Sequence, residues 1–265
     1  MTQLELRNIE FSYRRDNRDL FRLKNTNLKI DQGEFVIVIG PNGSGKSTLM
    51  KIISGFLKPN KGTVELNGKN ISAYSQIELA KKIAFVPQKH NFIYPYSIFE
   101  IIMMGRTPHL SFYGFEKNID HEKVNEAIEL VGLSGLKNKG INEVSGGEAQ
   151  RAFIARAFVQ EPEIILLDEP NAHLDIHHQL SIFDLLRKMN REKKLTVIAV
   201  SHDLNLSGHY GERIILMQNG QVFLDDQKEK VLTEKNIDMA FNVRSLVDSV
   251  SRKNTIRVLI TPDVN

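Results

Sequence analysis

The feature that most constrains the fold is a glycine-rich loop between an apolar run and a helical stretch. Residues 40–48 read Gly-Pro-Asn-Gly-Ser-Gly-Lys-Ser-Thr, which fits the pattern G-x-x-x-x-G-K-S. The apolar run Phe35–Ile39, which is rich in β-branched residues, directly precedes this loop. A predicted helix over Lys46–Ser54 begins within the last three residues of the loop. Glycines let the backbone turn tightly around an anion, and a helix N-terminus points N–H groups at it. The segment therefore predicts a phosphate-binding loop between a strand and a helix.

Two side chains of this loop carry the expected chemistry. Lys46 would supply positive charge to the β and γ phosphates of a nucleotide, and Ser47 would be a ligand of Mg²⁺. Because the loop backbone also faces the phosphates, every position is a candidate nucleotide contact, namely Gly40, Pro41, Asn42, Gly43, Ser44, Gly45, Lys46, Ser47 and Thr48.

A second apolar run, Ile164–Leu167, ends in Asp168 and Glu169. A buried strand end is a costly place for two carboxylates unless a cation or water is bound there. We expect Asp168 to hold the magnesium ion through water and Glu169 to polarise the attacking water. Without the loop upstream, an alternative is that the two acids are ordinary residues at the edge of solvent.

Continuous apolar runs indicate the fold class. Phe35–Ile39, Ile164–Leu167 and Thr196–Val200 do not alternate with polar residues, which suits central strands covered on both faces. Helical stretches such as Lys46–Ser54 and Gln179–Lys193 lie between them, so βαβ units are expected. The predicted fold class is α/β, with a P-loop NTPase core and a mostly parallel sheet.

Two further parts are expected around this core. Leu4–Ile9, Thr26–Ile30 and Gly62–Leu66 predict a small N-terminal antiparallel β subdomain. Between about Tyr94 and Gln160 the strand signal is lost and Asp120–Val131 has helical spacing, which indicates an inserted α-helical subdomain.

The expected organisation is a single domain over residues 1–265. Residues 1–92 and 161–240 form the nucleotide-binding core with its antiparallel part, residues 93–160 the helical subdomain, and residues 241–265 a C-terminal extension. In the last part of the chain we expect one helix over Val231–Phe241 and a final strand over Ile256–Ile260.

Composition excludes several classes of function. Lys and Arg number 35 against 32 Asp and Glu, and the resulting +3 charge argues for neither nucleic acid nor an anionic membrane as a partner. Zero cysteines exclude disulfides, thiolate metal sites and cysteine nucleophiles. The longest apolar runs fall far below the roughly 18 residues that a bilayer span needs, and the N-terminus does not resemble a secretory signal. We therefore expect the protein to stay in the cytoplasm.

A Ser-Gly-Gly turn is a second candidate anion site. Ser145, Gly146 and Gly147 precede Glu148 and a predicted helix over Ala149–Val159. Alone, the turn could be an ordinary glycine-rich helix start. Its position before the two carboxylates that end the Ile164–Leu167 run makes the combination specific.

With these three segments the chain resembles the ATP-binding subunit of ABC transporters. Residues 40–48 match the Walker A loop of that family, residues 145–148 its signature, and residues 164–169 its Walker B strand. Gln88 matches the Q-loop, Leu174-Asp175 the D-loop and His202 the switch histidine. The D-loop departs from the common pattern at Ala172 and His173.

The resemblance implies ATP and Mg²⁺ as cofactors and a role for each matched residue. The implied catalytic residues are Lys46, Gln88, Glu169 and His202, and the implied metal contacts are Ser47, Gln88 and Asp168. Tyr13 matches the aromatic residue that stacks on adenine, with Phe11 as a rival for that role. Further implied nucleotide contacts are Gln88, Ser145, Gly146, Gly147, Asp168 and His202. The remaining histidines are interpreted as residues without a metal role, namely His90, His109, His121, His177, His178 and His209.

The resemblance also implies partners. Each ATP would lie between the Walker A loop of one subunit and the signature of a second copy, so a homodimer is expected. Phe92–Ile98 and Met103–His109 look like the importer subfamily for iron chelates (siderophore or haem) and cobalamin, as does the region from Val231 to Phe241. Integral membrane permease subunits would dock there, with Tyr96 and Arg106 on the docking surface. Through the permease a substrate-binding protein would act, and the chain would lie on the cytoplasmic face of the membrane.

Other functions remain as alternatives. The motor of an ABC exporter is one. A soluble ABC-type ATPase acting on DNA or the ribosome is another, although such proteins usually carry a long insertion or a second cassette. A plain P-loop kinase or GTPase is a third alternative. The signature and Gln88 of this chain argue against a kinase, and the absence of an Asn-Lys-x-Asp guanine-binding motif from the sequence argues against a GTPase. Nucleic acid is not expected as a partner.

Overall fold

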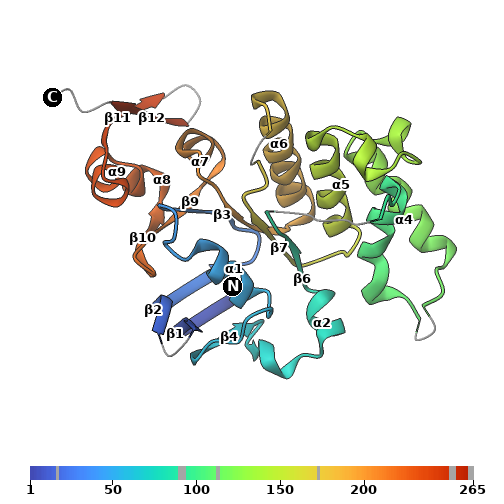
Figure 1. The fold of residues 1–265 in the computed structure, drawn as a ribbon, viewed down its shortest axis with the longest axis horizontal. Helices are drawn as coiled ribbons and strands as arrows, with labels where there is room; N and C mark the ends of the chain where they lie inside the picture. Colours follow the sequence, from blue (N-terminus) through green and yellow to red (C-terminus); the bar gives the residue numbers. More distant parts are fainter. Residues whose placement is uncertain (16–17, 89–93, 112–113, 172–173, 251–254, 262–265) are drawn as a thin grey trace.

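The main sheet has the predicted parallel arrangement. The computed structural model describes residues 1–15, 18–88, 94–111, 114–171, 174–250 and 255–261. Within them the main sheet has six strands in the order β10-β9-β3-β8-β7-β6, and every neighbouring pair except β10 and β9 is parallel. The predicted α/β class is thereby confirmed (Figure 1). The strands are β3 (Phe35–Ile39), β6 (Ile83–Val86), β7 (Ile164–Asp168), β8 (Thr196–Val200), β9 (Arg213–Gln218) and β10 (Gln221–Gln227).

Both faces of this sheet are covered, because successive residues of a strand point to opposite sides. Ile37 belongs to one hydrophobic core, together with residues of α5 (Gly146–Phe158), α6 (Ile176–Lys193) and α7 (Leu204–Tyr210). Val36 and Val38 belong to a second core, shared with α1 (Lys46–Ile53) and the N-terminal sheet. All five residues of β3 are buried, which explains why the strand reads as a continuous apolar run.

The N-terminal sheet is antiparallel, as predicted, but its first two strands are much longer than expected. Its order is β2-β1-β4-β5, formed by β1 (Thr2–Arg15), β2 (Arg18–Asp31), β4 (Lys61–Leu66) and β5 (Lys69–Asn70). Register shifts interrupt the pairing of β1 and β2, for example between Leu6 and Ile9. Each shift breaks the period-two alternation, so the sequence pattern shows only pieces of each strand.

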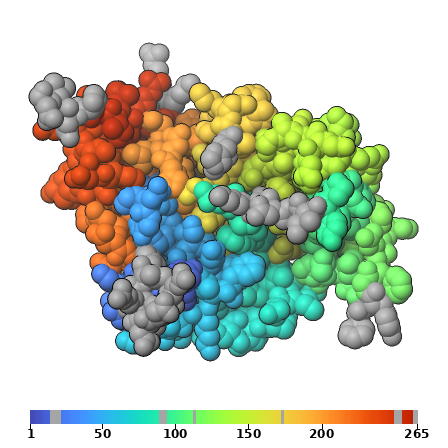
Figure 2. All heavy atoms as spheres, in the orientation of Figure 1, coloured from blue at the N-terminus to red at the C-terminus, as the bar shows by residue number. Residues whose placement is uncertain are grey.

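Short helices occupy the chain between β6 and β7 and form one end of the molecule, drawn in green in Figures 1 and 2. They are α3 (Ile98–Met103), η2 (Met104–His109), α4 (Asn118–Leu130), η3 (Ser134–Leu136), η4 (Ile141–Glu143) and α5. Between β5 and β6 lie η1 (Ile71–Ala73) and α2 (Gln76–Ala80). None of the helices in the described ranges is long and apolar enough to cross a bilayer.

The C-terminal part differs from the prediction of one helix over Val231–Phe241, which is wrong. The structure has α8 (Lys228–Val231) and α9 (Glu234–Phe241), because Thr233 takes an extended backbone and its hydroxyl caps α9 by accepting from the Asn236 amide at 3.3 Å. The helical spacing of apolar residues continues across this break, so the sequence pattern does not show where one helix ends and the next begins. The predicted final strand is confirmed as β12 (Thr255–Thr261), which pairs with β11 (Arg244–Val250) in a hairpin beside α7 (Figure 1).

Candidate nucleotide site

The glycine-rich loop connects the carboxyl end of β3 to α1, as the sequence predicts. Gly45 stands at the N-cap of α1 with φ of 106°, in the left-handed region that glycine adopts without strain. A Cβ atom at Gly40 would lie 2.2 Å from the Met217 carbonyl oxygen, so no larger residue fits there. The loop residues Asn42, Gly43, Gly45, Lys46, Ser47 and Thr48 line a hollow of about 330 Å³ together with Glu169.

Lys46 lies inside this loop rather than in open solvent. Its side chain is largely buried, and Nζ donates to the carbonyl oxygens of Gly40 at 2.9 Å and Pro41 at 3.0 Å. Burial lowers the pKa of Lys46, while the nearby charges of Glu169 and Asp168 act in the opposite direction. The ammonium group is therefore hydrogen-bonded to two neutral carbonyl groups, and its positive charge favours the binding of an anion in the loop.

Ser47 and Asp168 are brought together across the hollow. Ser47 Oγ donates to Asp168 Oδ1 at 3.0 Å, although the two residues are far apart in sequence. Burial raises the pKa of Asp168, and the hydrogen bond from Ser47 opposes that effect. A hydroxyl and a buried carboxylate are oxygen ligands of the kind that Mg²⁺ prefers, with phosphate and water completing its shell. Among the residues that the structure describes, no group of three or more His, Cys, Asp or Glu could hold a metal ion by itself.

Glu169, Gln88 and His202 form the second cluster of the site. Glu169 Oε1 lies 2.5 Å from His202 Nε2, and Glu169 Oε2 accepts a hydrogen bond from Gln88 Nε2. Glu169 follows β7, Gln88 follows β6 and His202 follows β8. These three strands are neighbours in the sheet, so their carboxyl ends meet at one edge. Glu169 has a φ of 53°, a conformation that is costly for a non-glycine residue and that recurs at functional sites.

Gln88 was expected to touch the metal as well as the nucleotide. The structure brings it to Glu169, while Ser47 and Asp168 bond to each other. The Gln88 amide is therefore placed to orient the carboxylate. Its role as a metal contact stays a prediction.

The two candidate aromatic residues differ in accessibility. Phe11 is buried in the core beneath the N-terminal sheet, whereas the Tyr13 side chain is exposed. Their rings meet edge to face with centroids 4.8 Å apart. Of the two, Tyr13 is the one that a base could reach.

The Ser-Gly-Gly turn caps α5. Ser145 Oγ accepts from the Glu148 amide at 3.3 Å, and Glu148 Oε2 accepts from the Ser145 amide at 2.7 Å, which is a complete capping box. The Ser145 amide, followed by its hydroxyl, lowers the pKa of Glu148. In Figure 1 the helices α5 and α1 lie apart, and no residue of the turn lines the hollow at the glycine-rich loop.

His178 has a contact that the sequence analysis missed. Its ring packs on Gly147, where a Cβ atom would lie 2.6 Å from His178 Cδ2. Its Nδ1 lies 2.7 Å from Asp175 Oδ2, and Asp175 Oδ1 caps α6 by accepting from the His178 amide. His178 therefore lies between Gly147 of the Ser-Gly-Gly turn and Asp175. The only sequence signal was its position three residues after a capping aspartate.

Other histidines make separate pairwise contacts. Nε2 of His109 lies 2.9 Å from the Gln160 carbonyl oxygen, and Nε2 of His121 lies 2.9 Å from Glu116 Oε2. The positions Ala172, His173 and His90 lie outside the residues that the structure describes.

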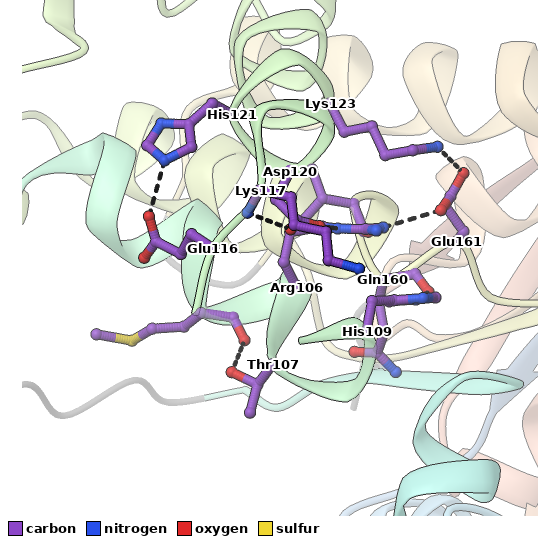
Figure 3. Close-up of polar contacts among 12 residues, drawn as sticks. Arg106, Thr107, His109, Glu116, Lys117, Asp120, His121, Lys123, Gln160 and Glu161 are labelled. Atoms are coloured by element: carbon purple, nitrogen blue, oxygen red, sulfur yellow. Dashed lines mark hydrogen bonds and ion pairs between the residues drawn. The ribbon is translucent and has the colours of Figure 1, made fainter. Parts of the chain in front are cut away.

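Arg106 was expected on a docking surface, and this expectation is wrong. The side chain is buried. Figure 3 shows it among the residues of the helical region with which it makes polar contacts. Its guanidinium donates to Asp120 Oδ1 at 2.9 Å, to the Val159 carbonyl at 2.7 Å and to Glu161 Oε2 at 2.8 Å. Burial alone would raise the pKa of Asp120, but hydrogen bonds from the Lys117 amide and Arg106 hold it below its usual value. The arginine thus joins η2 to α4 and to the end of α5.

Tyr96 is only half-exposed. Part of it packs against the core, while Tyr94, whose ring centroid lies 6.1 Å away, is mostly exposed. Of the residues in this segment that the structure describes, Tyr94 offers the more accessible aromatic surface.

We expect Arg106→Met to lower the free energy of unfolding by about 3–5 kcal/mol, because Asp120 would be left as a buried charge without its cation. Denaturant unfolding followed by circular dichroism measures the loss. Lys123→Met is the matched control, since Lys123 pairs with the half-exposed Glu161, and it should cost at most about 1 kcal/mol. Equal losses in both variants would contradict a special role for the buried pair.

The geometry agrees with comparisons to known proteins. The family described as ABC transporter matches residues 23–172. The chain is 37% identical over 223 residues to the petrobactin import ATP-binding protein FpuC of Bacillus anthracis, covering 84% of this chain and 82% of the relative. It is 39% identical to the hemin import ATP-binding protein HmuV of Escherichia coli O157:H7, covering 82% of this chain and 85% of the relative.

Solved structures give the same answer. An inward-facing transporter described as of the metal-chelate type matches with a TM-score of 0.85 and 27% identity, over 99% of this chain and 98% of that one. The dimeric ATP-binding cassette MJ0796 in a post-hydrolysis state with ADP and Pi matches with a TM-score of 0.76 and 34% identity, over 85% of this chain and 98% of that one. With the family match over residues 23–172, these likenesses show that the chain belongs to the ABC transporter family, as an ATP-binding cassette.

Proposed function

We propose that this protein is the ATP-hydrolysing subunit of an importer for iron chelates, either siderophores or haem. The observation that carries the ATPase mechanism is the position of Glu169. It lines the same hollow as Lys46 and Ser47, and it receives Gln88 and His202 from the two neighbouring strand ends. A carboxylate so placed can orient water toward a bound γ phosphate.

The reaction follows from these positions. Lys46 and the loop N–H groups bind the β and γ phosphates. Ser47 and Asp168, which bond to each other here, would hold Mg²⁺, and the ion would neutralise phosphate charge. Glu169 accepts a proton from the water whose oxygen attacks the γ phosphorus. The bond from that phosphorus to the β-phosphate oxygen breaks, and ADP leaves with phosphate. His202 and Gln88 hold the Glu169 carboxylate in place by their hydrogen bonds.

A homodimer completes the site. Because the signature turn lies apart from the glycine-rich loop of its own chain, we infer that the capped N-terminus of α5 meets the phosphates bound by a second copy. The dimeric form of the related cassette supports this arrangement.

A complementation experiment tests the shared site. We expect Ser145→Arg and Lys46→Ala proteins, each in a Glu169→Gln background, to stay monomeric in MgATP when separate and to form an ATP-bound dimer when mixed. Only the mixed dimer pairs an intact loop with an intact signature turn. Size-exclusion chromatography with light scattering measures the dimer. A mixture that remains monomeric would show that the two elements act within one chain.

The import function is proposed from similarity. The two relatives above are named for import of petrobactin and hemin, and both are matched over most of their length. We infer integral membrane permease subunits as partners, a substrate-binding protein acting through them, and a peripheral position on the cytoplasmic face of the membrane. The exposed ring of Tyr94, in the segment after Gln88, is a candidate contact with the permease.

The decisive experiment is reconstitution with the membrane protein that copurifies from detergent-solubilised membranes. We expect a polytopic partner, and proteoliposomes containing it should take up an iron-loaded siderophore or haem only with ATP supplied on the side of this protein. Transport in the opposite direction would identify an exporter motor. Copurification with nucleic acid or ribosomes would identify a soluble ABC-type ATPase instead.

A further inference from the structure

The switch histidine lies on a turn that the next helix holds in place. His202 stands between β8 and α7, and Asp203 caps α7 by accepting from the Asn205 amide at 2.8 Å and the Leu206 amide at 2.9 Å. The Asp203 carbonyl accepts from Ser207 Oγ at 2.7 Å, and Ser207 is completely buried. Any movement of the first turn of α7 therefore moves the backbone on which His202 stands.

Asn205 links this first turn to the C-terminal hairpin. Its Nδ2 donates to the Val258 carbonyl at 3.2 Å, and its Oδ1 accepts from the Val258 amide at 2.9 Å. The side chain thus pairs with both backbone groups of one residue in β12, as a neighbouring strand would. Two opposed hydrogen bonds define the position and orientation of the amide, whereas a single bond leaves it free to rotate.

The contact between α7 and β12 is also close in space. A Cβ atom at Gly208 would lie 2.4 Å from the Ile256 carbonyl oxygen, so only glycine allows the helix to approach this near. Ile256 and Val258 are both buried and belong to the core that includes α7. The hairpin is therefore packed onto the helix.

The hairpin has its own attachment to the rest of the protein. Ser245 Oγ donates to Asp238 Oδ1 at 2.7 Å, and the Val247 amide donates to Glu234 Oε1 at 3.0 Å, both on α9. Because these hydrogen bonds attach β11 to α9, its partner strand β12 can restrict the movement of α7. Figure 2 shows this C-terminal part, in red, at the opposite end of the molecule from the green helical region.

We propose that Asn205 is a positioning residue for His202, and that the β11–β12 hairpin fixes the switch histidine through it. This inference rests on the proposed function, in which His202 orients Glu169. A series of hydrogen bonds connects α9 to the hairpin, the hairpin to Asn205, and Asn205 to Asp203. Asp203 is the next residue after His202, whose Nε2 lies 2.5 Å from Glu169 Oε1. Small displacements of a group in a catalytic hydrogen bond are costly, with a shift of about 1 Å worth up to roughly 10²-fold in rate.

The test is a double-mutant cycle measured as single-turnover ATP hydrolysis, which resolves slow rates. We expect Asn205→Ala to lower the hydrolysis rate on the order of 10-fold and to leave the KM for ATP unchanged, since the residue touches none of the phosphate-binding groups. In a His202→Ala background the same substitution should have no further effect. Thr255→Ala is the matched control. Thr255 Oγ1 of the hairpin lies 2.9 Å from His209 Nδ1 at the far end of α7. Thr255→Ala removes this contact and should keep the wild-type rate.

Asn205→Asp covers the case in which Asn205→Ala fails to fold. It keeps the acceptor for the Val258 amide, and a carboxylate suits the first turn of a helix. It should lower the rate only in the presence of His202. An equal loss with and without His202, a raised KM, or the same loss in Thr255→Ala would each overturn the inference. A His202→Ala protein with the full wild-type rate would instead refute the proposed role of His202 itself.

Discussion

Replacing Glu169 with Gln should slow ATP hydrolysis on the order of 10²- to 10⁴-fold, because the carboxylate that we propose as the acceptor of the water proton is lost. The amide keeps the size of the side chain, so Lys46, Ser47 and Asp168 should still bind MgATP. Steady-state release of phosphate measures the rate, and equilibrium binding of a fluorescent ATP analogue measures affinity. A normal rate would remove Glu169 from the mechanism.

In the proposed mechanism ATP joins the subunits and hydrolysis separates them, so the same variant should accumulate as an ATP-bound dimer. Size-exclusion chromatography in MgATP distinguishes this dimer from the wild-type monomer. Glu163→Gln is the matched control. Its carboxylate stands at the opposite end of the same strand, paired with Lys82, and the variant should behave as wild type. A slow variant that remained monomeric would leave catalysis by Glu169 standing and refute the nucleotide-joined dimer.

Lys46→Ala should abolish measurable hydrolysis, with a loss on the order of 10³-fold or more, because the phosphates lose their buried cation. Stability should change little. Since burial lowers the pKa of Lys46, the charged side chain is less favourable in the folded state than in water, and its removal relieves that cost. Thermal unfolding and phosphate release measure the two effects. Lys58, an exposed residue after α1, provides the matched control, and Lys58→Ala should keep full activity.

A Lys46→Ala protein that hydrolysed ATP normally would refute the phosphate-binding role of the loop. A protein that unfolded instead would show that the hydrogen bonds from Lys46 to Gly40 and Pro41 are structural. The unfolding measurement separates these outcomes.

The parts of the site that the sequence predicted are those built from neighbouring residues. The loop at 40–48 requires a strand before it, glycines within it and a helix after it, and each is a local backbone preference. The Ser145 cap is equally local, because the hydroxyl and the Glu148 carboxylate are three residues apart. The predicted strands β7 and β8 were visible because fully buried strands are apolar throughout.

The sequence pattern failed where burial depends on distant residues. Arg106 looks like an exposed arginine in a polar loop, yet Asp120 and Glu161 reach it only once α4 and the end of α5 pack together (Figure 3). His178 is similar, since its contact with Gly147 exists only because α5 and α6 are neighbours. A buried ion pair leaves no periodic signal, because each partner is an ordinary polar residue in its own segment.

The sequence by itself therefore determined the phosphate-binding loop, the α/β class and the ATP-binding cassette resemblance, because these depend on short-range backbone preferences and on the order of motifs along the chain. Only the tertiary structure decided that β6, β7 and β8 are neighbours, which brings Gln88, Glu169 and His202 to one point. It also decided that the C-terminal hairpin packs on α7. The physical reason is that strand order and helix packing arise from contacts between residues far apart in sequence, whose free energy depends on the whole core and not on the pattern within any one segment.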